Sequence, residues 1–165
     1  MRFFRRLKLW LTNRPYYKQW KRYMKRQDTV RKKLKKQANE FCPWTGYYLH
    51  DMIKTMLEFY HDVYSTKDCC WSEPSRLEKI EKSLAETLQY FDLLEKIDDV
   101  GEDSELLPIA EAEPEFEDYL KTWTEENDMK VTDTVKSYLA YSFLEKIYTE
   151  RLYNSIGKHI WEWYD

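Results

Sequence analysis

Glu58 and His61 form the one spacing in the chain that is typical of a metal site, a Glu-x-x-His pair within a stretch of helical periodicity. Di-iron bundles use two such pairs together with carboxylates from two further helices. The other histidines, His50 and His159, have no Glu three residues before them. We therefore expect Glu58 and His61 to face solvent, and we predict that the protein uses no metal or other cofactor.

The cysteines are the next candidates for chemistry. Cys69 or Cys70 beside His50 or His61 would make a thiol–imidazole pair, but any chain with three of each residue type offers such a pair. The sequence contains no GxSxG, P-loop, GxGxxG or HExxH motif, the patterns that mark common catalytic and nucleotide sites. We predict that the protein is not an enzyme.

The same cysteines bear on the redox environment. Cys42, Cys69 and Cys70 are odd in number and lack CxxC spacing, and the neighbouring pair could form only a strained disulfide. We expect reduced thiols and a reducing, cytoplasm-like compartment.

The strongest chemical signal is positive charge. Residues 21–37, KRYMKRQDTVRKKLKKQ, contain nine Lys or Arg and a single acid. On a helical projection the bases cluster opposite an apolar stripe and form a ridge roughly 39 Å long. Each phosphate that such a ridge neutralises adds salt-dependent affinity. The predicted nucleic-acid or anion-binding residues are Lys18, Lys21, Arg22, Lys25, Arg26, Lys32, Lys33 and Lys36.

Charge is also divided along the chain. Residues 1–40 hold 15 of the 27 bases and two of the 30 acids, a net +13, so residues 41–165 carry −16. A solvated helix face usually mixes both signs, whereas this ridge leaves like charges together, which electrostatics disfavours. The partner of the ridge could be nucleic acid, an acidic protein surface, or the protein's own residues 98–118, which hold ten acids and no base.

Apolar periodicity predicts the elements that position these charges. We expect helices over residues 3–12, 16–41, 45–65 and from about 74 to 97, with a break at Asn13-Arg14-Pro15. The expected apolar face of the second helix includes Trp20, that of the third includes Leu49, Leu57, Val63 and Tyr64, and that of the fourth is the stripe Leu77, Ile80, Leu84, Leu88 and Phe91. Residues 98–114 are expected to form an acidic loop, followed by a short helix after Pro114. Thr132 or Asp133 should cap a last helix whose apolar residues point in nearly every direction, which is typical of a central helix.

These elements predict an all-α fold, a bundle of five or six helices around the C-terminal helix. The expected domains are a basic amphipathic helix over residues 1–14 and a single helical domain over residues 15–165.

The first helix has an apolar face, formed by Phe3, Phe4, Leu7, Trp10 and Leu11. That face suits an anionic membrane surface or a groove on a partner protein, but docking onto its own bundle is the commoner fate of so short a helix. No run reaches the roughly 18 to 20 apolar residues that span a bilayer, and the N-terminus lacks the features of a signal peptide.

The C-terminal residues LYNSIGKHIWEWYD resemble the Ile-Gly-Lys-x-Ile-x-x-Trp-Trp/Tyr-Asp ending of small helical proteins encoded by tailed bacteriophages. The segment CPWTGYYLHDMIKTMLEFYHDVYS is similar in style to a W-D-Y-x-x-L-x-x-x-M-x-x-K-L-x-x-M segment of those proteins, although Thr45 replaces its Asp and the Lys near the second Met is absent. The matching residues are Trp44, Tyr47, Leu49, Met52, Met56 and Leu57. The resemblance implies a phage origin and a helical fold, and it transfers no functional residue. Physically, we expect Ile160, Trp161 and Trp163 to pack as a clasp while Asp165 stays exposed.

Together these observations predict a non-enzymatic, phage-type binding protein of the host cytoplasm that uses basic N-terminal helices on an anionic partner, with nucleic acid as the first candidate. One alternative is an accessory or inhibitory protein that binds a host protein through Glu111, Glu113, Glu115 and Glu117. Another is a virion component whose basic arm touches packaged DNA.

Overall fold

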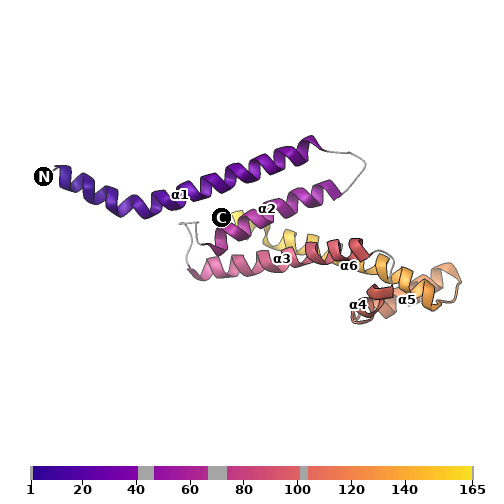
Figure 1. Cartoon of the computed structure of the whole chain (residues 1–165). Coiled ribbons are helices and arrows are strands. Elements are labelled where there is room, and N and C mark those ends of the chain that lie inside the picture. Colours follow the sequence, from indigo (N-terminus) through magenta and orange to yellow (C-terminus); the bar gives the residue numbers. More distant parts are fainter. Residues whose placement is uncertain (1, 41–46, 67–73, 101–103, 165) are drawn as a thin grey trace. The chain divides into compact units, whose positions relative to one another are not determined.

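The computed structural model describes residues 2–40, 47–66, 74–100 and 104–164, with backbone alone for residues 2–15, 47, 48, 104 and 164. The elements lie along the chain as shown in Figure 1, and no strand occurs in these four ranges. The prediction of an all-α bundle of five or six helices is confirmed. The helices are α1 (Arg2–Asn39), α2 (Tyr47–Ser65), α3 (Pro74–Val100), the short 3₁₀ helix η1 (Ser104–Leu106), α4 (Leu107–Glu111), α5 (Phe116–Asn127) and α6 (Asp133–Tyr164).

The chain divides into two compact units. Unit 1 consists of residues 1–88 and 161–165, and unit 2 consists of residues 89–160. The long helices α3 and α6 contribute residues to both units.

Helix α1 runs without interruption from Arg2 to Asn39, so the predicted break at Asn13-Arg14-Pro15 is wrong, and residues 14 and 15 do not mark a helix boundary. A proline in a helix interior removes one backbone hydrogen bond and bends the helix without having to end it. Figure 1 shows α1 changing direction in its N-terminal half. Pro15 provides the physical cause for such a bend.

Unit 1 buries apolar side chains of α2 and of the first half of α3. The predicted stripe of α3 is confirmed at Leu77, Ile80 and Leu84. The apolar face predicted for α2 is buried in the C-terminal half of the helix, but the prediction is wrong at Leu49, which is exposed. The buried residues of α2 are Thr55, Leu57, Val63 and Tyr64.

The C-terminal end of α6 closes unit 1 through one tryptophan. The Trp163 indole is buried and its Nε1 donates to Ser83 Oγ at 2.9 Å, while the Tyr64 hydroxyl donates to the Trp163 carbonyl at 2.9 Å. Trp161 is 79% exposed, so its predicted part in the clasp is wrong. Ile160 is half-buried, and Asp165 lies outside the described residues.

Unit 2 contains the segment that the sequence predicted to be an acidic loop over residues 98–114. Residues 98–100 instead form the end of α3, and η1 and α4 occupy residues 104–111. Leu106 and Ala110 are fully buried there, and burial of these two apolar side chains explains why this acidic stretch folds. Helix α5 lies where predicted, with the Phe116 ring 5.0 Å from that of Phe143.

Helix α6 begins as predicted. The Val135 amide donates to Thr132 Oγ1 at 3.4 Å, which is the arrangement of an N-cap. Along α6 a buried face includes Leu139, Phe143, Leu144 and Leu152, but Tyr153 is exposed. The apolar residues of α6 are therefore not buried on all sides.

The remaining predictions concern membrane contact and the cysteines. No helix in the described part of the chain is both long enough and apolar enough to cross a bilayer. The three cysteines and the side chains of residues 3–12 lie outside what the structure describes, so the redox state of the cysteines and membrane contact by residues 3–12 stay predictions.

Candidate functional site

The predicted basic ridge lies on α1, which pairs with α2 in an antiparallel manner. Gln37 Nε2 donates to the Asp51 carbonyl at 3.4 Å and to Thr55 Oγ1 at 3.1 Å in the first half of α2, whereas the rings of Tyr23 and Phe59 lie 5.9 Å apart further along it. Tyr23, Val30 and Leu34 are partly buried on this side of α1. The face of α1 that holds α2 is therefore apolar at its centre and polar at its margins.

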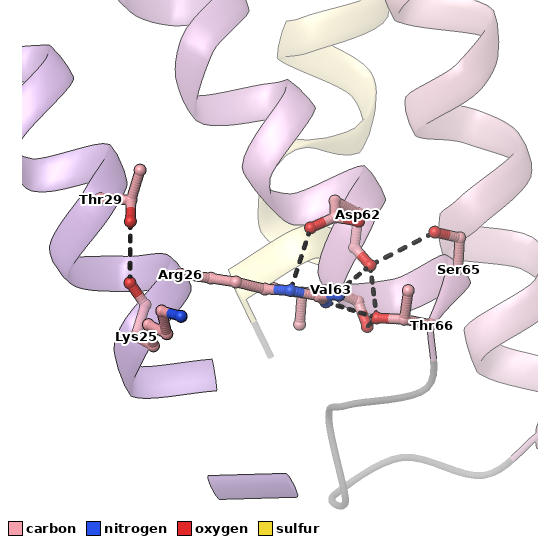
Figure 2. A network of polar contacts seen from close by, with 7 residues as sticks. All are labelled: Lys25, Arg26, Thr29, Asp62, Val63, Ser65 and Thr66. Atoms are coloured by element: carbon pink, nitrogen blue, oxygen red, sulfur yellow. Dashed lines mark hydrogen bonds and ion pairs between the residues drawn. The ribbon is translucent and has the colours of Figure 1, made fainter. Parts of the chain in front are cut away.

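Arg26 lies on that margin and closes the C-terminal end of α2, as Figure 2 shows. Its Nε lies 3.3 Å from a carboxylate oxygen of Asp62, and its Nη1 donates to Thr66 Oγ1 at 2.6 Å and to the Asp62 carbonyl at 3.4 Å. The last carbonyls of a helix have no partner within the helix and carry partial negative charge. Arg26 thus caps α2 rather than facing an external ligand.

Lys33 and Lys36 also have acidic neighbours. The Lys33 ammonium lies 3.5 Å from the Glu58 carboxylate of α2, and that of Lys36 lies 3.7 Å from Glu40, which directly follows the last residue of α1. The ridge predicted from the sequence is therefore not uniform. Arg26 and Lys33 hold α2, and the other predicted bases belong to the rest of the α1 surface.

Five of the predicted lysines share a narrow outward stripe. At about 100° per residue they fall within about 60° of the helix circumference and extend over roughly 27 Å of axis. All five are exposed, and the structure gives no ion pair to Lys18, Lys25 or Lys32 among the residues it describes. We call this set the lysine stripe: Lys18, Lys21, Lys25, Lys32 and Lys36. Arg22 is exposed at its edge.

An aromatic pair borders the lysine stripe. Tyr17 is 53% exposed and Trp20 is 45% exposed, and their rings stack with centroids 6.1 Å apart at 24°. The Lys21 ammonium sits 5.0 Å from the centre of the Tyr17 ring. The sequence prediction placed Trp20 on the apolar face of the helix and gave Tyr17 no role. The available signal was that aromatic residues alternate with bases between residues 16 and 23.

The acids of the alternative site are engaged within unit 2. The Glu113 carboxylate accepts two hydrogen bonds from Arg151, at 3.0 and 2.8 Å, and a third from the Tyr148 hydroxyl at 3.0 Å. Glu115 accepts from the same guanidinium at 3.3 Å, and Glu111 pairs with Lys136. Three of the four predicted acids thus tie the segment around α4 to α6, and Glu117 is exposed.

These contacts shift the titration of the groups involved. The hydrogen bonds from Arg151 lower the pKa of Glu113 against the opposing effect of its burial. Burial, followed by the hydrogen bond to Glu113, raises the pKa of Tyr148 to about 12, so its hydroxyl remains a donor at neutral pH. The hydrogen bond to Glu111 raises the pKa of Lys136. The acidic segment therefore has a structural task, and reversing its charges would disrupt unit 2 whatever it binds.

The two side chains of the Glu-x-x-His pair, Glu58 and His61, lie in different surroundings on α2. The Glu58 carboxylate faces Lys33, and His61 is half-buried. The described residues contain no group of three or more His, Cys, Asp or Glu side chains placed to hold a metal ion.

Comparison of the chain with protein-family models, with curated proteins and with solved structures gave no match.

Proposed function

We propose that this protein is a non-enzymatic binding protein that holds nucleic acid on the lysine stripe of α1. The observation that carries the proposal is the outward direction of the stripe. Helix α2 supplies acids to Arg26 and Lys33, whereas Lys18, Lys25 and Lys32 are exposed on the opposite side of the helix. Regularly spaced cations along one face of a helix match a regularly charged backbone, and the phosphates supply affinity without any sequence preference.

The phage-type origin implied by the C-terminal resemblance, and action in the cytoplasm of an infected host, belong to the same proposal. In that setting a sequence-independent nucleic-acid binder finds abundant ligand. Binding of this kind uses displacement of condensed counterions, so its strength depends steeply on salt.

The test is binding of the full chain to labelled duplex DNA, single-stranded DNA and single-stranded RNA between about 50 and 200 mM salt. We expect affinity that falls steeply with salt. The variant K18E/K25E/K32E should lose at least about ten-fold in affinity, because three phosphate contacts become repulsive.

A matched control separates the stripe from net charge. The variant K121E/K146E/K158E makes the same change in charge on exposed lysines of unit 2, and it should bind as the unmodified protein does. Absence of binding at low salt, or an equal loss in both triple variants, would contradict the proposal.

A further inference from the structure

The exposed aromatic pair beside the lysine stripe is the feature that the proposed function leaves unused. In unit 1 the Trp163 indole is 2% exposed, whereas Trp20 is 45% exposed and stacks against Tyr17, which is 53% exposed. A buried Tyr or Trp removes about 150 to 250 Å² from water. Two neighbouring rings that forgo this burial present flat apolar faces on the surface of the protein.

The position of the pair on α1 identifies its neighbours. Tyr17 and Lys21 are four residues apart and the ammonium lies over the ring, while Trp20 directly precedes Lys21. Arg26 and Thr66 meet at the end of α2, and Trp20 lies roughly 9 Å further along the α1 axis, beyond that end. This position explains why α2 leaves Trp20 exposed although it continues the apolar stripe.

A ligand that meets both features must combine negative charge with a flat apolar surface. A phosphodiester strand with unpaired bases has both, whereas a duplex keeps its base faces inside the stack. Proteins that bind single strands combine a cationic track with aromatic rings on which bases stack. Charge complementarity with the lysine stripe favours this occupant over a second copy of the basic helix, which would repel it.

We infer that the preferred ligand of α1 is single-stranded nucleic acid, with its phosphates along the lysine stripe and an unpaired base stacked on the Tyr17–Trp20 pair. This inference rests on the proposed function and specifies its ligand. It assigns Tyr17 and Trp20 a binding task that is independent of charge.

The experiment compares a thymidine oligonucleotide of about 20 nucleotides, longer than the site of one small binding module, with a duplex of equal length. Affinity for each oligonucleotide is measured for the unmodified full chain and for the variants Trp20→Ala and Tyr17→Ala. We expect each substitution to weaken single-strand binding by about five-fold or more. Duplex affinity and the salt dependence of single-strand binding should not change, because no charge is removed.

Two further variants act as controls. Trp20→Phe keeps an aromatic face and should retain most of the affinity, and Trp161→Ala removes an even more exposed indole from α6 and should change nothing. Circular dichroism should show full helix content for Trp20→Ala, since Ala favours helix.

The outcomes distinguish this inference from the proposed function. If Trp20→Ala weakens single-strand and duplex binding equally, or neither, while K18E/K25E/K32E still loses affinity, the stacking inference is overturned and the stripe stands. If the unmodified protein binds no nucleic acid at low salt, both are overturned. Sedimentation with anionic lipid vesicles and sedimentation velocity then show whether a membrane or a second copy covers the aromatic pair.

Discussion

At the scale of single residues, two tryptophans near the C-terminus show how position decides the task of a side chain. Trp163 is buried and donates its indole N–H to Ser83, whereas Trp161, two residues earlier in α6, is 79% exposed. Successive residues in a helix differ in direction by about 100°, so two positions separate opposite sides of α6. Ser83 in turn donates to the Ile80 carbonyl, so the indole joins a satisfied buried network.

We therefore expect Trp163→Ala to lower the free energy of unfolding by about 3 to 5 kcal/mol, because it leaves a cavity and an acceptor without its donor. Trp161→Ala should change it by less than about 0.5 kcal/mol. Urea denaturation followed by circular dichroism measures both. Equal effects of the two substitutions would show that Trp163 does not hold the end of α6.

Glu113 is the second residue whose surroundings make a specific prediction. Its pKa is lowered in the folded state, chiefly by the hydrogen bonds from Arg151. A carboxyl with a lowered folded pKa stabilises the fold above its ordinary pKa, and this stabilisation is lost as the pH falls through the folded value. Glu113→Gln should cost about 1 to 2 kcal/mol at neutral pH and should make the loss of stability between about pH 5 and pH 3 less steep.

The control for this prediction is Glu125→Gln, on an exposed carboxylate of α5. Urea midpoints measured across the acid range should follow the unmodified protein for Glu125→Gln. If the Glu113→Gln curve also has the unmodified slope, the ion pair with Arg151 does not stabilise unit 2.

At the scale of elements, neighbouring bases of α1 have separate tasks. The side chain of Lys25 is exposed, and its carbonyl accepts a hydrogen bond from Thr29 Oγ1 (Figure 2), whereas Arg26 caps α2 through Asp62 and Thr66. Arg26→Ala should lower the free energy of unfolding by about 1 kcal/mol and weaken nucleic-acid binding little. Lys25→Ala should leave the free energy of unfolding nearly unchanged and should weaken nucleic-acid binding. Urea denaturation and oligonucleotide titration of both variants test this, and interchanged effects would contradict the division of the ridge.

The sequence predicted elements well where one apolar face meets one core. The stripe of α3 is the clearest case, since Leu77, Ile80, Leu84 and Phe91 are all buried. It failed where local composition disagrees with tertiary contacts. Ten acids suggested a solvated loop, but burial of Leu106 and Ala110 and the pairing of Glu113 with Arg151 stabilise α4 there.

The predicted site divides along the same line. A helical projection placed all eight bases opposite the apolar stripe, and the sequence alone could not show which of them face acids of another helix. Asp62 and Glu58 lie 36 and 25 residues away from Arg26 and Lys33, so only the pairing of α1 with α2 reveals these contacts.

At the scale of the whole molecule, the two units carry opposite charge. Unit 1 holds 20 bases and 12 acids, a net +8, and unit 2 holds seven bases and 18 acids, a net −11. Acids of unit 2 face Lys136 and Arg151 within that unit. The lysine stripe of unit 1 remains the concentrated positive surface of the described residues, and an external polyanion is the partner that its charge predicts.

The most direct test of that claim is the slope of log affinity for single-stranded DNA against log salt concentration, measured for the unmodified protein and for K18A/K25A/K32A. Each phosphate contact contributes about 0.7 to this slope for a single strand. Loss of three contacts should therefore make the slope less steep by about 2. The same slope in both proteins would mean that the nucleic acid does not lie on the lysine stripe.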